Sequence, residues 1–255
     1  MSGRTRPRGP LRWLLTFVKE IAVVVVGALI VSAVVRAFVG QAFEIPSGSM
    51  ERTLGIGDRV VVEKLSDVKR GEVVVFADPG GWLPPTTHHE RGPVGRALEF
   101  VGLLPDTGTD HLTKRIIGLP GDQVVCCDSR GRITVNEHPL NEDAYLYAAP
   151  DGRQDRPSDI RFSVVVPAGR VFVLGDHRSN SRDSRCHLDD RRPGQPRGDN
   201  AFVPINLVVG RAVAIYWPLS HLDTLKIPST FADVPAGQTP APSRASVQAG
   251  PDADC

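Results

Sequence analysis

The feature that most constrains this 255-residue chain is an uncharged apolar run at residues 21–35, IAVVVVGALIVSAVV. Soluble helices rarely carry apolar side chains on every face. Fifteen helical residues span only about 22 Å, and the apolar residues up to position 39 extend the surface toward the roughly 30 Å of a hydrocarbon core. We therefore predict a transmembrane anchor helix over residues 21–39.

The residues before this run carry mostly positive charge, which favours an N-terminus in the cytoplasm. These basic residues are Arg4, Arg6, Arg8, Arg12 and Lys19, with Glu20 as the one acid among them. A cleaved secretory signal and a buried helix of a soluble protein remain alternatives. The anchor is favoured because the run leads directly into a polar motif. We expect residues 1–20 in the cytoplasm and the rest of a single-pass membrane protein outside it.

After the anchor, short segments rich in valine and isoleucine alternate with turn residues. Such segments fit a pleated sheet, and their spacing predicts a mainly β, antiparallel domain over residues 40–218. The expected strands lie at residues 59–64, 72–76, 122–127, 132–136, 161–167, 170–176 and 208–217.

Two stretches rich in proline, glycine and charge interrupt these strands, at residues 78–110 and 139–159. We expect both to be surface excursions. Residues 94–104 are apolar enough for a short amphipathic helix, either packed on the sheet or lying at a bilayer surface. Hydrophobic periodicity fades late in the chain, so residues 219–255 are expected to be disordered.

The charge balance and the cysteine pattern each exclude a class of partner. Lys plus Arg total 30 against 29 Asp plus Glu, so the net charge of +1 gives no reason to expect nucleic acid. Zinc sites need spaced ligands, whereas the candidate ligands here are adjacent pairs. These pairs are Cys126–Cys127, His88–His89 and Cys186–His187. We expect neither a metal nor another cofactor.

Three polar segments have residue types that can carry chemistry. Residues 43–54, FEIPSGSMERTL, form a turn able to present a hydroxyl and a backbone N–H together. Residues 114–122, KRIIGLPGD, open on a lysine in a strand, and residues 175–185, GDHRSNSRDSR, form a dense polar loop. If Lys114 faces apolar neighbours, its pKa falls from about 10.4 toward neutrality and its free amine can accept a proton.

In this order, the segments resemble the bacterial type I signal peptidases, or leader peptidases, in a single-anchor form like that of actinobacteria. IPSGSM resembles the nucleophile segment, KRIIGLPGD the general-base segment and GDHRSNSRDSR the polar loop of that family. GDRVVVEK at residues 57–64 and GRAVAIYWP at residues 210–218 also fit, so the likeness covers about residues 43–217. It implies a β-rich catalytic core with a smaller β region inserted before the polar loop.

The resemblance implies a role for each matching residue. Ser49 is expected to be the nucleophile and Lys114 its general base, with Ser47 Oγ and the Ser49 N–H as the oxyanion hole. Ser181 is expected to hydrogen-bond Lys114, and two further residues to support the region. These are Asp183 and Arg185. Residues near the pockets for small substrate side chains at positions −1 and −3 would be Phe43, Ile45, Met50 and Leu54.

The implied activity is removal of signal peptides from exported preproteins at the membrane, with the bilayer and the protein export machinery as further partners. Two positions depart from the family pattern. Arg52 stands where proline is usual, and His177 where asparagine is usual. The disulfide we expect outside the cytoplasm joins Cys186 to Cys126 or Cys127, leaving Cys255 unpaired.

Three alternatives differ in chemistry or class. A Ser-His-Asp hydrolase would use a histidine, of which His177 is the best placed, but no GxSxG elbow supports it. An anchored β-rich binding module would make the serines incidental. A self-cleaving regulatory peptidase would share the Ser-Lys chemistry but carry a soluble DNA-binding segment in place of an anchor.

Overall fold

The computed structural model describes residues 10–38, 40–84, 92–95 and 110–249. Helix α1 (Pro10–Phe38) contains a stretch, Trp13–Ala33, that is long and apolar enough to cross a membrane by length and composition. These residues span about 31 Å at 1.5 Å per residue. The apolar span begins before residue 21, where the sequence analysis placed it, because Leu14, Phe17 and Val18 extend it upstream of Lys19.

The described residues 40–84 and 110–249 belong to a β-rich unit distinct from the unit of α1. The expected mainly antiparallel β architecture is confirmed, since every strand pairing is antiparallel. The strands are β1 (Gly40–Glu44), β2 (Arg59–Glu63), β3 (Val73–Ala77), β4 (His111–Gly118), β5 (Gln123–Cys126), β6 (Ile133–Val135), β7 (His138–Pro139), β8 (Phe162–Val165), β9 (Arg170–Leu174), β10 (Val203–Pro204), β11 (Val208–Trp217), β12 (Asp223–Thr224) and β13 (Ser246–Ala249).

The larger, eight-stranded sheet has the order β1-β2-β11-β3-β4-β9-β10, with β12 paired to β11. Val60 and Val62 of β2 are buried while their neighbours are more exposed, which is the alternation of a sheet with one covered face. Strands β3 and β4 lie in the middle of this order and are buried along most of their length. The centre of the larger sheet is therefore shielded from solvent, and a polar side chain held there is desolvated.

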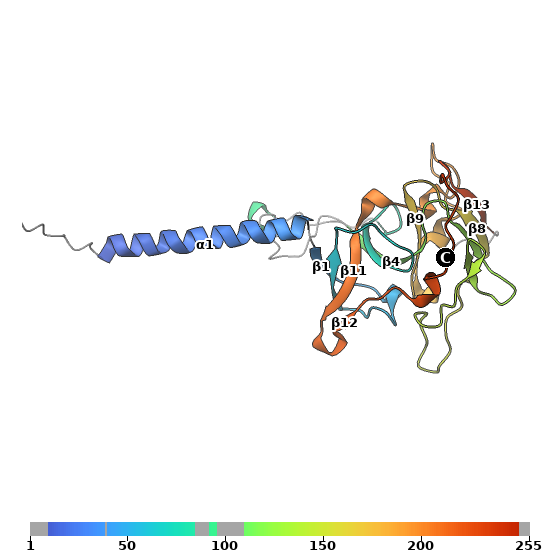
Figure 1. Ribbon diagram of the computed structural model, residues 1–255, viewed down its shortest axis with the longest axis horizontal. Coiled ribbons are helices and arrows are strands. Elements are labelled where there is room, and N and C mark those ends of the chain that lie inside the picture. Colours follow the sequence, from blue (N-terminus) through green and yellow to red (C-terminus); the bar gives the residue numbers. More distant parts are fainter. Residues whose placement is uncertain (1–9, 39, 85–91, 96–109, 250–255) are drawn as a thin grey trace, which may run out of the picture. The chain divides into compact units, whose positions relative to one another are not determined.

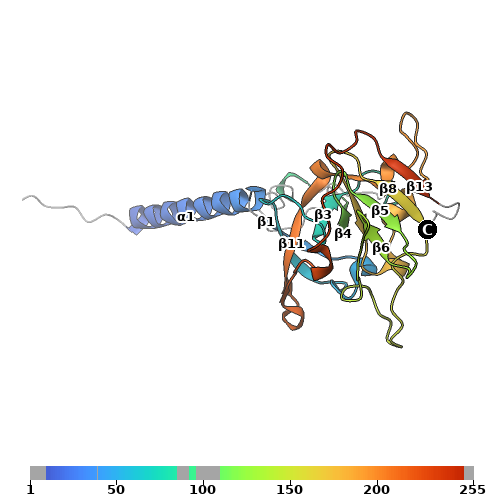
Figure 2. The ribbon, with the colours of Figure 1, turned by 45° about the vertical axis from the view of Figure 1, so that its right-hand side comes forward.

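The smaller, five-stranded sheet has the order β13-β8-β5-β6-β7. Strands β5 to β8 lie in the chain between β4 and β9, so the expected inserted β region is present. Figures 1 and 2 show these strands gathered at one end of the β-rich unit, away from β1 and β11. Ile117 of β4, Phe172 of β9 and Val124 of β5 share one hydrophobic cluster, which joins the two sheets.

The segment after residue 218 contradicts the expectation of disorder as far as residue 249. Phe231 and Val234 pack in the core, and β13 pairs with β8. The backbone N–H of Gln238 donates to Gly121 O at 2.8 Å, and a Cβ on Gly121 would lie 2.2 Å from Gln238 O. A few apolar contacts and a close backbone approach thus order a segment whose composition suggests a flexible tail.

The stretch 139–159 is likewise not a simple surface excursion. Leu140 and Leu146 are buried in the core of the smaller sheet, and Glu142 and Tyr145 are buried beside them. In the described part of the stretch 78–110, Trp82 is buried and its ring N–H donates to Asn200 O at 3.0 Å. The helix expected at residues 94–104 lies largely outside the described residues.

The expected disulfide between Cys186 and the 126–127 pair is wrong. Cys126 and Cys127 are bonded to each other, so neither thiol is available to Cys186. The two cysteines are adjacent at the end of β5, whereas Cys186 lies in a 3₁₀ turn of the polar loop, Ser184–His187. The expectation for Cys255 lies outside the described residues.

Candidate active site

A tight turn after β1 places Ser49 inside the β-rich unit. Ile45 ties the entry of this turn to the chain beyond it, because its N–H donates to Asp58 O at 2.8 Å and its carbonyl accepts from Gly57 N at 2.9 Å. A single 3₁₀ turn, Gly48–Met50, follows and is closed by the bond from Glu51 N to Gly48 O at 3.0 Å. Ser49 is only 7% exposed.

Lys114 lies on β4, opposite Val74 of β3 in the middle of the larger sheet. Its side chain is 3% exposed, and its Nζ lies 2.6 Å from Ser49 Oγ. The two residues are 65 positions apart in the sequence. The sheet thus brings together the serine and the lysine that the sequence analysis selected.

The surroundings of Lys114 favour the neutral amine. The pKa of Lys114 is lowered from 10.5 to about 8, mainly by burial and also by the nearby charge of Arg185, against the opposite effect of the Asp183 and Asp176 carboxylates. A base with a pKa near 8 is partly unprotonated at neutral pH, whereas an ordinary lysine is not. A hydroxyl within hydrogen-bond distance of such an amine can transfer its proton to it.

Ser47 precedes the 3₁₀ turn in an extended conformation, and its hydroxyl lies 3.4 Å from Ser49 Oγ. Ser47 is exposed, unlike Ser49, so its hydroxyl can meet a ligand that approaches from solvent. Ser47 and Ser49 thus lie on one turn of the chain, and their use as an oxyanion hole stays a prediction.

The polar loop after β9 packs through its backbone against residues 45–54, the turn that carries the expected nucleophile and is called the nucleophile turn below. The N–H of His177 donates to Ser49 O at 3.1 Å, and the N–H of Gly175 donates to Asp183 Oδ2 at 3.0 Å. A Cβ on Gly175 would lie 2.6 Å from Ser49 O, so only glycine permits this approach.

Asp183 and Arg185, which the resemblance implied would support this region, form a buried ion pair. Arg185 Nε and Nη2 donate to the two carboxylate oxygens at 2.9 and 2.8 Å. Burial alone would raise the pKa of Asp183, but the charge and hydrogen bonds of Arg185, with the Gly175 N–H and the charge of Lys114, hold it below its usual value. The pair therefore stays ionised and holds the polar loop in place.

The expected hydrogen bond from Ser181 to Lys114 is not formed. Ser181 is buried, and its Oγ has no hydrogen-bond partner in the structure. A Cβ on Gly175 would lie only 2.2 Å from this hydroxyl oxygen. The loop backbone thus brings Ser181 near the nucleophile turn, while Lys114 directs its Nζ to the Ser49 hydroxyl.

The residues expected near the substrate pockets belong mainly to the core. Ile45, Met50 and Leu54 are at most 2% exposed and share one hydrophobic cluster. Phe43 packs against this cluster and keeps some exposed surface. These side chains fix the shape of the turn, and contact with substrate remains a prediction for Phe43 above all.

The sequence analysis missed an ion pair next to the turn that carries Ser49. Arg115, the residue after Lys114, binds both carboxylate oxygens of Asp176 at 2.8 and 2.5 Å and donates to Gly71 O. Asp176 Oδ2 also accepts the hydroxyl of Thr53 at 2.5 Å, which ties the nucleophile turn to β4 and the polar loop. Successive residues of a strand face opposite sides, so Lys114 and Arg115 contact different neighbours.

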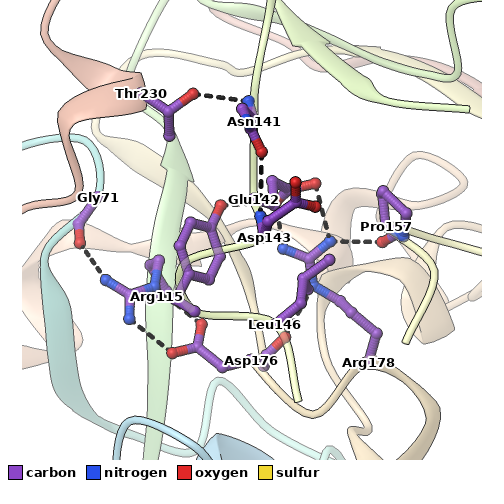
Figure 3. Close-up of polar contacts among 12 residues, drawn as sticks. Gly71, Arg115, Asn141, Glu142, Asp143, Leu146, Pro157, Asp176, Arg178 and Thr230 are labelled. Atoms are coloured by element: carbon purple, nitrogen blue, oxygen red, sulfur yellow. Dashed lines mark hydrogen bonds and ion pairs between the residues drawn. The ribbon is translucent and has the colours of Figure 1, made fainter. Parts of the chain in front are cut away.

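A second buried ion pair was also missed (Figure 3). Arg178 of the polar loop donates to Glu142 Oε1 at 2.5 Å, and the Tyr145 hydroxyl donates to the same oxygen at 2.6 Å. The guanidinium of Arg115 lies over the Tyr145 ring, 4.4 Å from its centroid. Arg115 was detectable because it neighbours Lys114, but Glu142 had no sequence signal.

His177, the histidine that the sequence analysis singled out, contacts Glu51 and Gly48. Its Nδ1 lies 2.8 Å from Glu51 Oε2 and 3.2 Å from Gly48 O. The ring therefore binds the nucleophile turn at its backbone, whereas Lys114 reaches the Ser49 hydroxyl. The geometry favours lysine over histidine as the base.

Comparisons with known proteins agree with these motifs. The family model described as signal peptidase, peptidase S26, matches residues 18–217. The signal peptidase I of Mycobacterium tuberculosis is 37% identical over 226 residues, covering 80% of this chain and 74% of that one. A probable signal peptidase I-2 of Synechocystis is 36% identical over 210 residues, covering 81% and 76%.

A crystal structure of a signal peptidase I from Enterococcus faecalis V583 is also similar, at 20% identity and a TM-score of 0.29, covering 57% of this chain and 97% of that one. A likeness at that level adds nothing to the assignment. The family model and the two relatives suffice, because each covers more than two thirds of the chain. The chain belongs to the signal peptidase family, peptidase S26.

Proposed function

We propose that this chain is a membrane-bound serine endopeptidase that removes N-terminal signal peptides from exported preproteins, with Ser49 as nucleophile and Lys114 as general base. The observation that carries the proposal is the 2.6 Å approach of the Lys114 Nζ to the Ser49 Oγ in a buried setting. A lowered lysine pKa and a neighbouring hydroxyl on Ser47 support it.

The reaction begins when the neutral Lys114 amine takes the Ser49 hydroxyl proton and Oγ attacks the scissile carbonyl. Negative charge develops on the carbonyl oxygen, where the Ser47 hydroxyl and the Ser49 N–H donate to it. The Lys114 ammonium then gives its proton to the leaving amine, and an acyl-enzyme remains. Water activated by the same lysine hydrolyses that ester and regenerates Ser49.

The substrate proposed is a preprotein with small side chains at positions −1 and −3 of its cleavage site. Substrate recognition is proposed to involve Phe43, which has exposed surface beside the nucleophile turn. The relatives named signal peptidase I support this substrate class.

The proposed location is the cell membrane, with helix α1 as a single-pass anchor, the N-terminus in the cytoplasm and the β-rich unit outside it. The span Trp13–Ala33 supports an anchor, and the basic residues that precede it support this orientation. The β-rich unit also exposes large apolar side chains, which favour contact with a bilayer surface. They include Ile56, Trp217, Leu219 and Leu222.

The test uses the detergent-solubilised full chain and a signal-bearing precursor. N-terminal sequencing of the product should find a new terminus directly after a small residue. Ser49→Ala and Lys114→Ala should each abolish the product while leaving the thermal unfolding transition cooperative. Persistent cleavage by Lys114→Ala would overturn the assignment of the base.

A further inference from the structure

The peptide bond between Gly48 and Ser49 is held by a side chain from the polar loop. The carbonyl of Gly48 faces the Nδ1 of His177 at 3.2 Å and also accepts the backbone N–H of Glu51 at 3.0 Å. A peptide unit is planar and trans, so its C=O and N–H point in opposite directions. Whatever fixes the Gly48 carbonyl therefore fixes the direction of the Ser49 N–H.

The protonation of Nδ1 follows from its two neighbours. It faces the Gly48 carbonyl oxygen and the Glu51 carboxylate, 2.8 Å away, and both can only accept a hydrogen bond. Nδ1 must therefore carry a proton, whether the ring as a whole is neutral or charged. His177 is thus a donor to the nucleophile turn and has no free Nδ1 with which to act as a base there.

The ring of His177 is held from both sides. Glu51 fixes its Nδ1 edge, and the Tyr147 ring stacks on its face with centroids 3.7 Å apart. The backbone of Tyr147 is itself fixed, because its N–H donates to Asp176 O at 3.0 Å and its carbonyl accepts from Asp155 N at 2.9 Å. The ring therefore has little freedom to turn away from Gly48.

Arg52 adds a second link from the same turn to the same stretch, since its Nε donates to Ala144 O at 3.2 Å. Its φ of +86° cannot be adopted by proline, whose ring fixes φ near −65°. The turn is therefore held here by side-chain contacts to neighbouring segments and not by a rigid ring in its own backbone.

We propose that His177, held by Glu51 and Tyr147, is a positioning residue that aims the Ser49 N–H at the developing oxyanion. This inference rests on the proposed function. The hydrogen bond to the Gly48 carbonyl fixes the peptide plane, and it also polarises that peptide so that its N–H becomes a stronger donor. His177 touches neither the substrate nor Ser49 Oγ in this role.

Two substitutions at position 177 separate the donor from the ring. His177→Asn keeps an N–H at the position of Nδ1 but removes the surface that stacks on Tyr147. His177→Phe keeps a stacking ring and removes the donor. With precursor cleavage by the full chain as the assay, His177→Phe should lower kcat by about tenfold to a hundredfold with little change in KM, as expected for a misaimed transition-state donor.

His177→Asn should retain kcat within about threefold of the parent. The inflection of the pH–rate profile should stay at the same pH in His177→Phe, because that inflection is assigned to Lys114. Glu51→Ala removes the carboxylate that holds His177 Nδ1 and should also lower kcat. In the double variant with His177→Phe, kcat should fall little below its value in His177→Phe alone.

The inference is overturned if His177→Phe keeps the parent kcat, or if kcat falls as far in His177→Asn as in His177→Phe. Loss of one ionisation from the pH profile of His177→Phe would instead make His177 a base. Ser49→Ala in the same assay keeps the two proposals apart: if it still cleaves, the nucleophile assignment fails. If it does not cleave and His177→Phe is unchanged, only the role of His177 fails.

Discussion

Replacing Lys114 with methionine should abolish cleavage and at the same time stabilise the fold at neutral pH. The pKa of Lys114 is lowered from 10.5 to about 8 by burial, so the folded protein binds this proton less tightly than the unfolded chain does. Below about pH 8 the buried ammonium therefore costs the full difference, about 3 kcal/mol at 1.36 kcal/mol per pKa unit. Methionine fills a similar volume without a charge.

The sign of this effect fixes its pH dependence. The free-energy cost of the buried Lys114 ammonium is complete below the pKa of Lys114 in the folded protein. It decreases as pH rises from about 8 to 10.5 and amounts to only about 1 kcal/mol at pH 10. Between pH 7 and pH 10 the free energy of unfolding of the parent should therefore rise by about 2 to 3 kcal/mol relative to that of Lys114→Met. Loss of the bond to Ser49 offsets part of the gain from methionine at every pH but does not change this difference.

The assay is urea unfolding of the detergent-solubilised parent and variant, followed by tryptophan fluorescence at several pH values. Lys226→Met is a matched control, because Lys226 is exposed and the same substitution there removes no buried charge. Titrations common to all three proteins cancel in the comparison. Parallel pH dependences of the parent and Lys114→Met would refute the claim that burial depresses the Lys114 pKa.

Three further results are expected. The value of kcat/KM for precursor cleavage should rise with pH to an inflection near 8, with about a tenth of Lys114 free at pH 7, and an optimum near pH 5 would contradict a lysine base. Glu142→Ala should lower the free energy of unfolding by about 3 to 5 kcal/mol because it leaves Arg178 buried without its partner, whereas an apolar replacement of both residues should cost less. If residues 219–249 are part of the core, Phe231→Ala should lower the free energy of unfolding by about 3 to 5 kcal/mol, measured by urea unfolding. An unchanged urea midpoint would show that they are not.

Much of the β architecture could be predicted because its signal is local. Segments rich in valine and isoleucine, separated by turn residues, predicted β2, β3, β8, β9 and β11 within a few residues, since β-branched side chains fit a pleated sheet. The order of the polar segments similarly predicted which serine and which lysine to examine. In the structure these two side chains are 2.6 Å apart.

The ordered C-terminal segment could not be predicted from its composition. Alanine, proline, serine and glycine side chains bury little apolar surface, and the segment shows no regular spacing of apolar residues. Its order depends on Phe231 and Val234 reaching a core built by other strands, and on β13 finding the free edge of β8. Docking of this kind leaves only isolated apolar residues in the sequence.

The sequence by itself determined the apolar span, the strand pattern and the family to which the chain belongs. The tertiary structure alone decided that Lys114 is buried against Ser49, that Glu142 neutralises Arg178, and that His177 binds the Gly48 carbonyl. The physical reason is that pattern and propensity act between near neighbours in the chain. Desolvation of a charge and the direction of a hydrogen bond depend on groups brought together from distant segments.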